Sequence, residues 1–467
     1  MEASGIDTRR RALGVCLVAA FMTGLDVSIV NVALPSIREG LQASEDGLQW
    51  TLSGYALTFG LLLVPAGRLG DARSRRTLFL WGVVLFTLSS AACGFAWSMN
   101  VLIVARLVQG MAAGLLNPQV SGLIQQMFRG YERGRAFGAL GATIGVSTAA
   151  GPLIGGALVT AFGPELGWRW VFLVNLPIGL ALVPLAHRLL PARTTSDGEA
   201  GRRHESMDPV GVLLLGLGVA CLLLPFIQQH QWHGQAKWLL VPLALLVLAG
   251  FVAWERAYRR EPLVDLSLFR KRSYSLGSAI ALFYFAGFTD IFFAFTLYLQ
   301  SGLGYSPLMA GLSITPFALG SASASVVGGR LVSKAGRRLV TAGLVTVIAG
   351  LAATMAATLL VPGHHVGLAT ALPLLVAGVG SGLVISPNQA ITLSEVPPEG
   401  GGSAAGVLQT GQRLGSSIGI AAAGSVFFGS LPQGWPTAFR HGLFVVLACV
   451  CVALLAALLD LARTRRA

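Results

Sequence analysis

Four charged residues stand inside long apolar stretches of this sequence: the acids Asp26 and Asp290, and the bases Arg106 and Arg413. A charge at such a position is costly in a membrane, and where it occurs it usually marks an ion or substrate pathway. Burial raises the pKa of a carboxyl group and a nearby arginine lowers it again, so such a carboxylate can bind and release a proton. These residue types predict reversible proton binding rather than covalent catalysis.

The composition requires lipid as the solvent for most of the chain. Of the 467 residues, 54% are hydrophobic and 11% are charged, whereas soluble proteins carry roughly 25% charged residues. A spanning helix needs about 20 mainly apolar residues, and the sequence contains fourteen such stretches. The sequence therefore predicts an all-α polytopic membrane protein with 14 transmembrane helices. They are expected near 12–34, 48–70, 77–98, 101–124, 136–161, 168–190, 207–229, 237–256, 274–299, 306–331, 338–361, 366–391, 402–428 and 439–461.

The positions of the basic residues orient these helices. With a cytoplasmic N-terminus, 27 of the 33 Lys and Arg residues fall in inner segments and 4 in outer segments, while Arg106 and Arg413 lie within apolar stretches. An excess of Lys and Arg in cytoplasmic loops is the general rule. We therefore expect a multi-pass protein of the cell (plasma) membrane with both termini in the cytoplasm. Contact of these loops with anionic lipid headgroups accounts for the net charge of +13 without nucleic acid.

An internal repeat divides the chain. "GRLGDARSRR" (67–76) follows the second stretch, and "GGRLVSKAGRR" (328–338) follows the tenth; Gly67 aligns with Gly329, and Arg75-Arg76 aligns with Arg337-Arg338. Repeated halves with a site between them are a common plan in transporters. We expect a six-helix bundle over 1–190, a linker with two inserted helices (about 207–229 and 237–256) over 191–273, and a second six-helix bundle over 274–467.

The depth of the four charges along their helices predicts two pairs. At about 1.5 Å per residue, Asp26 lies roughly 13 Å and Arg106 roughly 9 Å from the outer ends of their helices. By the same rise, Asp290 lies about 16 Å from an outer end and Arg413 about 18 Å from an inner end, so both are near the midplane. Asp26 beside Arg106 is the preferred proton site; the alternative is a structural pair that only joins two helices. Asp290, a further candidate for proton coupling, and Arg413 are expected to form the parallel pair of the second half.

Five motifs in order resemble the major facilitator superfamily and, within it, the fourteen-helix drug:proton antiporter branch. They are "LDVSIVNVALP" (25–35), "GRLGDARSRR" (67–76), "RLVQG" (106–110), "GPLIGG" (151–156) and "WRWVFLVNLPIG" (168–179). The resemblance covers nearly the whole chain. The first loop motif departs from the family at Ala72 and Ser74, and its second copy has Ser333 where an acid is usual.

The resemblance implies a conformational gate. Asp71, with Gly67 before it and the basic residues Arg75 and Arg76 after it, is expected to lock the two halves together at the cytoplasmic face. A solvated loop acid is the alternative for Asp71. In the fifth helix, Gly151, Pro152, Gly155 and Gly156 belong to a small-residue face with a proline kink, which suits a gate or leak barrier, or packing alone.

Substrate contacts are expected beside the charges. Asp290 lies in "FYFAGFTDIFFAF" (283–295), and a carboxylate among aromatic rings such as Phe288 and Phe292 suits an organic cation; the alternative is that these rings pack between helices or face lipid. Asn31 and Gln109 are further candidates as polar groups of the cavity.

These observations predict a proton-coupled exporter of hydrophobic small molecules, with cations expected, and not an enzyme. The sequence has no G-x-x-x-x-G-K-[ST] phosphate loop, and its five cysteines show no metal-site spacing, so we expect no cofactor and no metal, only a proton gradient. We expect a monomer in the bilayer. The alternatives are a dedicated exporter of one endogenous metabolite or antibiotic, an uptake symporter, which "GPLIGG" argues against, and a membrane sensor.

Overall fold

Helices make up every regular element in the part of the chain that the computed structural model describes, which is residues 2–191, 208–227, 234–258, 262–361 and 363–464. Serine side chains begin several of them: Ser44, Ser74, Ser98 and Ser306 each accept a hydrogen bond from a backbone N–H of the first turn. Such caps satisfy donors that a helix start leaves free, and they allow the short loops between neighbouring spans.

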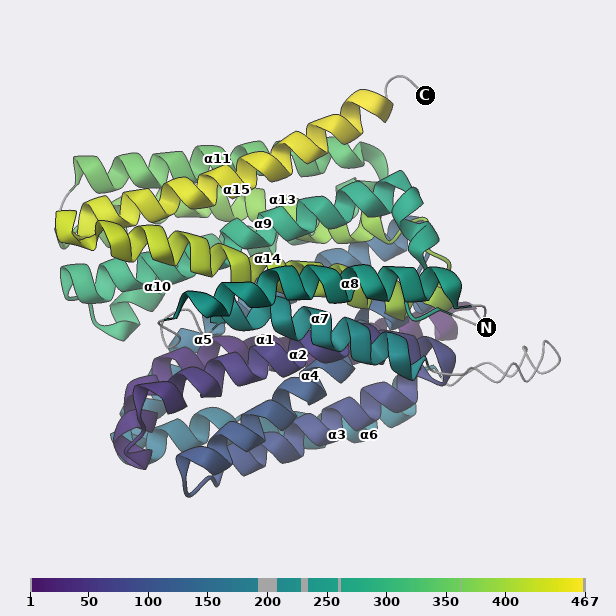
Figure 1. Cartoon of the computed structure of the whole chain (residues 1–467), viewed down its shortest axis with the longest axis horizontal. Coiled ribbons are helices and arrows are strands. Elements are labelled where there is room, and N and C mark those ends of the chain that lie inside the picture. Colours follow the sequence, from purple (N-terminus) through teal and green to yellow (C-terminus); the bar gives the residue numbers. More distant parts are fainter. Residues whose placement is uncertain (1, 192–207, 228–233, 259–261, 362, 465–467) are drawn as a thin grey trace.

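The chain forms two groups of long helices and an inserted pair (Figure 1). The first half comprises α1 (Glu2–Leu41), α2 (Glu45–Ala72), α3 (Arg75–Gly94), α4 (Met99–Met127), α5 (Gly130–Leu173) and α6 (Asn175–Leu189). The inserted pair is α7 (Pro209–Ile227) and α8 (Leu240–Ala257). The second half comprises α9 (Arg272–Leu297), α10 (Pro307–Ala335), α11 (Arg337–Leu360), α12 (Val366–Ala369), α13 (Ala371–Thr392), α14 (Gly401–Ser430) and α15 (Trp435–Thr464). Single turns η2 (Gln235–Leu239), η3 (Leu266–Arg270), η4 (Tyr298–Gly302), η5 (Pro398–Gly400) and η6 (Leu431–Gln433) connect some of them.

The described residues contain fourteen helical spans long and apolar enough to cross a membrane, which confirms the predicted number. The fifth and sixth spans, Gly130–Gly163 and Glu165–Leu189, meet at Gly163, whose φ of 76° breaks the helix. Glycine adopts this left-handed conformation at little cost. The predicted helix 366–391 is divided into α12 and α13, with Thr370 between them.

The packing within one half is repeated in the other. In the first half, α1 packs on α5 and α6, α2 on α4, and α3 on α4 and α6. The second half shows the same pattern, with α9 on α14 and α15, α10 on α13, and α11 on α13 and α15. Thus α1–α6 correspond to α9, α10, α11, α13, α14 and α15. The exact limits of the predicted units stay predictions, since residues 192–207 lie outside the described residues.

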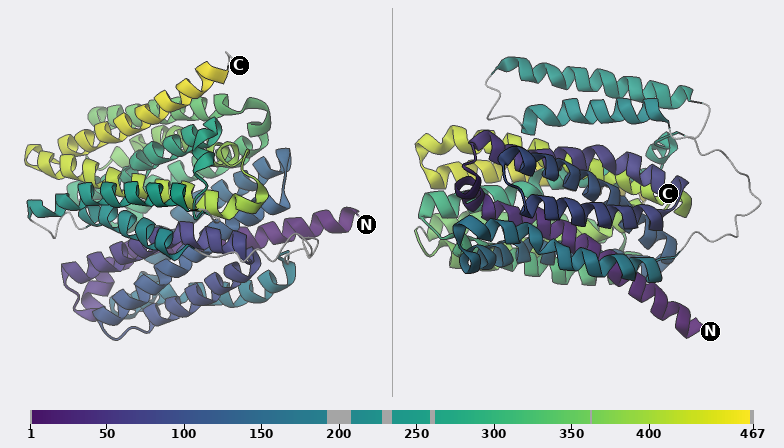
Figure 2. Two further views of the ribbon diagram at one scale, coloured as in Figure 1. Left: turned by 45° about the vertical axis from the view of Figure 1, so that its right-hand side comes forward. Right: turned by 90° about the horizontal axis from the view of Figure 1, so that it is seen from below.

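The two halves meet along two equivalent seams. Helix α5 packs on α10, and its counterpart α14 packs on α2. The inserted helices α7 and α8 pack on each other, and α7 also packs on α2 and α14. Figure 2 shows this pair as a separate layer on one side of the molecule. The inserted helices therefore cover the α2–α14 seam.

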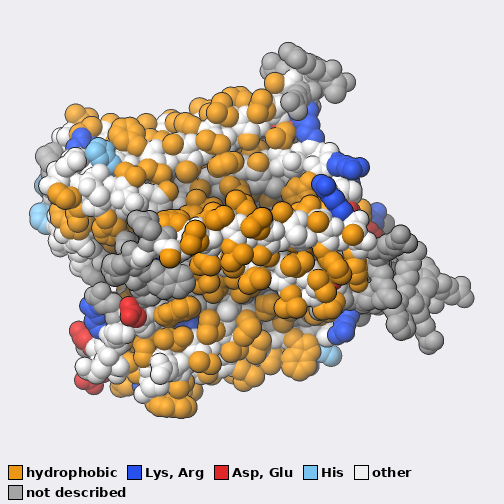
Figure 3. Space-filling view, in the orientation of Figure 1, with side chains coloured by type: hydrophobic (Ala, Val, Ile, Leu, Met, Phe, Trp, Pro, Cys, Tyr) orange, Lys and Arg blue, Asp and Glu red, His pale blue; other side chains and the backbone are white. Residues whose placement is uncertain are grey.

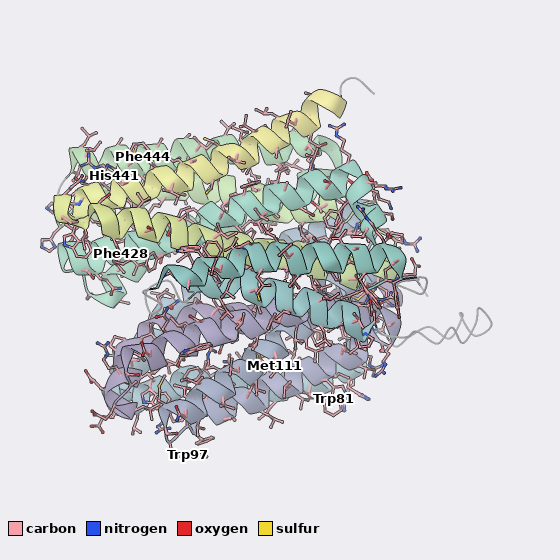
Figure 4. All side chains as sticks on the ribbon, viewed as in Figure 1. Trp81, Trp97, Met111, Phe428, His441 and Phe444 are labelled. Carbon is pink, nitrogen blue, oxygen red and sulfur yellow. The ribbon has the colours of Figure 1, made fainter. Side chains whose placement is uncertain are left out.

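The surface is divided as a membrane protein requires. Hydrophobic side chains cover the span between two ends that carry most of the charged side chains (Figure 3). Trp81 and Trp97 are 65% and 78% exposed and lie on the outer side of the first half (Figure 4). We call the end that carries the α2–α3 and α10–α11 turns the basic end.

Candidate functional site

Asp26 of α1 and Arg106 of α4 form an ion pair deep in the first half. The distance between Arg106 Nη1 and Asp26 Oδ2 is 2.6 Å. Asp26 is 0% exposed and Arg106 is 1% exposed, so neither is in contact with bulk water. The contact predicted from the depth of the two residues is present.

Three further side chains complete a closed polar network. Gln109 Nε2 and Asn175 Nδ2 donate hydrogen bonds to Asp26 Oδ1, at 2.9 and 3.2 Å, and both also donate to the Ser90 hydroxyl. Gln109 Oε1 accepts from Arg106 Nη1 at 2.8 Å. Both carboxylate oxygens of Asp26 are thus occupied, as a buried charge requires. Gln109, predicted as a cavity contact, is fully buried in this network.

Asn175 was missed by the sequence reasoning, although it stands in the quoted stretch "WRWVFLVNLPIG". It is the first residue of α6 and is fully buried. An amide at a helix start, among aromatic residues and before a proline, was the available signal. Its contact joins α6 to the Asp26 network.

Aromatic rings cover the Arg106 guanidinium. Its carbon Cζ lies 4.2 Å from the centroid of the Tyr55 ring and 5.7 Å from that of Phe172. A guanidinium over an aromatic face is stabilised by the ring quadrupole. The Tyr55 ring meets the Phe59 ring edge-on at 5.8 Å, and Arg413 of α14 lies over Phe59 with Cζ at 4.1 Å from its centroid. The contact between Phe59 and Arg413 therefore joins the two halves at this point.

The parallel pair predicted for the second half is not formed. Among the described side chains, neither carboxylate oxygen of Asp290 has a hydrogen-bond partner, and Arg413 takes part in no ion pair. Arg413 does not take the place of Arg106 in the repeat, because Arg106 is on α4, whose counterpart is α13, whereas Arg413 is on α14, the counterpart of α5. Although α9 packs on α14, Ser416 lies level with Phe285 and Thr289, so Arg413, three residues before Ser416, is nearer the basic end than Asp290.

Asp290 is also separated from the aromatic rings with which the sequence associated it. Phe288 and Phe292 are each two residues away, about 200° around the helix, and both rings pack with Phe317 of α10. Asp290, 0% exposed, shares its face with Gly287, which lies against Val446 and Val450 of α15. The structure therefore does not group the carboxylate with the rings. The substrate roles predicted for Asp290, Phe288 and Phe292 stay predictions.

Asn31 lies outside the Asp26 network. Its side chain is exposed and donates to the carbonyl of Val27 in the preceding turn at 3.3 Å. Its predicted role as a substrate contact stays a prediction.

A second polar cluster, which we call the clamp, joins the halves at the basic end. Asp71 of α2 accepts hydrogen bonds from the backbone N–H groups of Gly402 and Ser403, at 2.9 and 2.7 Å, in the first turn of α14. A carboxylate at this end of a helix is favoured by the helix dipole. Arg75 forms an ion pair with Asp71 at 2.5 Å and also donates to the carbonyls of Pro398 and Glu399.

Close backbone contact supports the clamp. A Cβ at Gly67 would collide with the backbone of Gly402. Further hydrogen bonds cross between the halves nearby, from Gln125 to the Gly401 carbonyl at 3.2 Å and from Arg133 to the Ser394 carbonyl at 3.1 Å. The basic end is therefore closed in this structure.

Arg76 does not join the two halves. It donates to the carbonyl of His187 at the end of α6, within the first half. In the second copy of the motif, Arg337 forms an ion pair with Asp460 of α15 at 2.6 Å. Asp460 thus supplies an acid near the repeat, but from a distant part of the sequence, which is why the motif comparison did not find it.

The predicted small-residue face of α5 is divided between two partners. A Cβ at Gly151 or Gly155 would meet Ser28 and Ile29 of α1, in the same half, whereas Gly156 has nothing within 4 Å of such a Cβ among the described residues. Pro152 does face the other half, at Gly311 of α10. The non-helical residue in α5 is Gly163, not Pro152. These three glycines therefore do not line the inter-half seam, and the gating role predicted here stays a prediction.

The comparisons with known proteins agree with this architecture. The family model described as Major Facilitator Superfamily matches residues 16–420, and the chain belongs to this family. It is therefore a membrane transporter rather than an enzyme. It is 17% identical to the proton:xylose symporter XylE (TM-score 0.69, covering 97% of this chain and 95% of that one) and 15% identical to the human organic anion transporter MFSD10 (TM-score 0.70, covering 96% and 99%). These structural likenesses show the fold.

Relatives of known name are more similar in sequence. The chain is 39% identical over 433 residues to the "Probable actinorhodin transporter" of Streptomyces coelicolor, covering 91% of this chain and 73% of that protein. It is 33% identical to the tetracenomycin C resistance and export protein of Streptomyces glaucescens (87% and 74%) and 34% identical to the puromycin resistance protein pur8 of Streptomyces alboniger (91% and 83%).

Proposed function

We propose that this chain is a proton-coupled antiporter that exports hydrophobic small molecules, such as drugs or antibiotics, across the cell membrane. The observation that carries the proposal is the buried Asp26–Arg106 pair, in which a titratable carboxylate of α1 is held by groups from two other helices, α4 and α6. The names of the relatives support export as the direction of transport. A proton gradient is the energy source, and no cofactor is required.

Asp26 is proposed as the proton carrier. Protonation removes the negative charge on which Arg106, Gln109 and Asn175 converge. Arg106 then loses its partner, and an unpaired buried charge is strongly unfavourable. The helices α1, α4 and α6 must rearrange or the proton must leave. Coupled exchange of substrate and proton follows if substrate binding favours the helix arrangement of either protonated or deprotonated Asp26. The alternative is that the pair only joins α1 to α4.

The clamp is proposed to close the cytoplasmic side. With the basic end facing the cytoplasm, as the distribution of Lys and Arg favours, the closed basic end denies substrate access from the cytoplasm in this conformation. Export requires the Asp71 contacts with α14 to break so that substrate can enter from the cytoplasm. Arg75 takes part directly, and Gly67 permits the close approach.

A dedicated exporter of one antibiotic is the second candidate. The relatives named for actinorhodin and for tetracenomycin C each carry the name of one compound. Efflux of one compound in preference to unrelated drugs of similar hydrophobicity would favour it over multidrug export.

Efflux from proteoliposomes tests the proposal. The purified chain is reconstituted, the vesicles are loaded with a fluorescent hydrophobic dye, and an inward-directed or outward-directed pH gradient is imposed. We expect uphill dye movement only when protons flow the opposite way, and none with a protonophore. Dye movement that ignores the gradient, or accumulation in the direction of proton flow, would contradict antiport.

A further inference from the structure

Arg413 differs from the other three intramembrane charges in its exposure. Asp26 and Asp290 are 0% exposed and Arg106 is 1% exposed, whereas the Arg413 side chain is partly exposed. A molecule that reaches the centre of the protein in this conformation meets a guanidinium and neither carboxylate. The charge presented to a substrate is therefore positive.

Aromatic and polar groups from both halves lie beside Arg413. Phe59 of α2 stacks under the guanidinium at 4.1 Å. Ser416, one turn along the same face of α14, lies 2.8 Å from the Thr289 hydroxyl of α9 and contacts the Phe285 carbonyl. The rings of Phe285, Phe288 and Phe292 are partly exposed and continue along this side of α9. The Phe288 and Phe292 rings thus lie on the side of α9 that is turned away from Asp290, and Ser416 contacts α9 one turn along α14 from Arg413.

We propose that Arg413 is the receptor for an acidic group, a carboxylate or phenolate, on an aromatic substrate. A guanidinium without an acidic partner can donate parallel charge-assisted hydrogen bonds to such a group, and the neighbouring rings supply apolar area for a planar body. This inference rests on the proposed export function and names its substrate class. It reverses the preference for cations expected from the aromatic stretch around Asp290.

The same contacts connect this receptor to the proton site. From Arg413, the rings of Phe59 and Tyr55 follow one another at 5.8 Å, and Tyr55 lies 4.2 Å from Arg106, the partner of Asp26. The Tyr55 hydroxyl is buried and has no partner among the described residues. A substrate that draws Arg413 away from Phe59 acts directly on the rings that cover the proton site.

Equilibrium binding of two dyes in detergent tests the proposal. Fluorescein and tetramethylrhodamine methyl ester share the xanthene ring system, but near neutral pH the first is anionic and the second cationic. We expect wild type to bind fluorescein more tightly, and Arg413→Gln to weaken it about tenfold or more, because hydrogen bonds to a charged group are lost. Binding of the cationic dye should not fall. Arg413→Lys should recover part of the affinity, and Arg338→Gln, an exposed arginine of α11, serves as the matched control.

Two results would overturn the proposal: wild type that does not prefer fluorescein, or equal weakening of both dyes in Arg413→Gln. Binding needs no proton gradient, so an absence of antiport in liposomes would defeat the proposed function without deciding this test. If Arg413→Gln does not fold, Arg413→Lys still decides, because a retained charge must keep fluorescein bound.

A separate chain of contacts connects the inserted helices to the clamp. Glu255 of α8, 5% exposed, accepts hydrogen bonds from the backbone N–H groups of Leu263 and Val264 at 3.3 and 3.4 Å. The Leu263 carbonyl accepts from the Ser403 hydroxyl at 3.1 Å, and Ser403 N–H is one of the two donors to Asp71. Helix α8 is thus connected to the clamp through one short segment.

Apolar packing supports the same connection. Leu263 and Val264 are buried in a cluster with Phe251 of α8 and Val64 of α2, and Val407 of α14 packs against it. Movement of α14 away from α2 must separate this cluster or carry the segment along. We infer that Glu255 is a positioning residue that stabilises the closed clamp through segment 262–266.

Hydrogen–deuterium exchange of the full chain tests this second inference. We expect Glu255→Gln to speed exchange about tenfold in segment 262–266, since a charge-assisted bond is lost, and also at the start of α14. Asp71→Asn, which contacts neither Glu255 nor the segment, should speed exchange in 262–266 as well. Glu395→Gln, an exposed glutamate at the same end, is the control. Faster exchange confined to the mutated element in both variants would refute the connection, and Ser403→Ala provides the check if Glu255→Gln does not fold.

Discussion

In the first half, Asp26 and Arg106 meet at 2.6 Å and are enclosed by Gln109 and Asn175. In the second half, Asp290 and Arg413 form no pair among the described side chains; Asp290 is fully buried and Arg413 is partly exposed. The two halves share their helix packing, so the difference is not one of fold. Under the two proposals above, one half holds a closed titratable pair while its repeat offers a single charge to a ligand. Proton binding and substrate binding are then separable by mutation.

The largest effect is expected from Asp26→Asn. The variant lacks the proposed proton carrier, so uphill efflux driven by a pH gradient should fall about 100-fold, in line with loss of a proton-transfer group. Exchange of dye without a gradient should continue, because Arg413 and the aromatic rings are unchanged. Proteoliposome efflux and gradient-free counterflow measure the two quantities.

Stability must be controlled in that experiment. Removing one partner of a buried ion pair costs about 3–5 kcal/mol, so the double variant Asp26→Asn with Arg106→Gln is made in parallel. If gradient-driven efflux survives in either variant, the pair is only structural, and the comparison between the halves loses its functional meaning.

The next largest effect is expected at the clamp. The two copies of the loop motif differ between the halves, as the intramembrane charges do. Asp71 binds the first turn of α14, but the second copy has Ser333, and its neighbour Val332 lies against Gly134 near the start of α5. Asp71→Asn should open the basic end about tenfold more often, since charge-assisted hydrogen bonds are weakened. Labelling of a cysteine placed at buried Ser121 of α4 measures the opening.

The reciprocal change should act in the other direction. Ser333→Asp adds a carboxylate near the start of α5, where a favourable helix-dipole interaction of about 0.3–1 kcal/mol is available. Labelling at Ser121→Cys should slow a few-fold, which corresponds to that energy. Faster labelling would mean that the second seam does not use the chemistry of the first.

The sequence predicted the number of helices, their order and the Asp26–Arg106 contact, because hydropathy and depth depend only on distance along the chain. It failed for Asp290 and Arg413, because depth does not tell which side of a helix a residue faces or which neighbour it meets. Arg413 is on the counterpart of α5 rather than of α4, and Asp290 faces α15. Asn175 and Asp460 complete their clusters from distant parts of the sequence. Such contacts depend on helix packing, which no local motif encodes.

The smallest effect on transport is expected from Asp290→Asn, and it tests the comparison from the side of the second half. A carboxyl group that is 0% exposed and has no partner among the described side chains contributes an unsatisfied polar group, which costs about 1–3 kcal/mol. An amide at this position carries no charge, so the midpoint temperature of thermal unfolding in detergent should rise. The rate of pH-driven efflux should stay within about twofold of wild type, a change below roughly 0.5 kcal/mol in barrier height. Cationic and neutral dyes should be affected alike, because Asp290 does not reach the partly exposed side of α9. A loss of efflux as large as that of Asp26→Asn would make Asp290 a second proton carrier. A loss confined to cations would instead make it a substrate contact. In either case the second half would use its acid, and the two halves would differ only in the placement of Arg413.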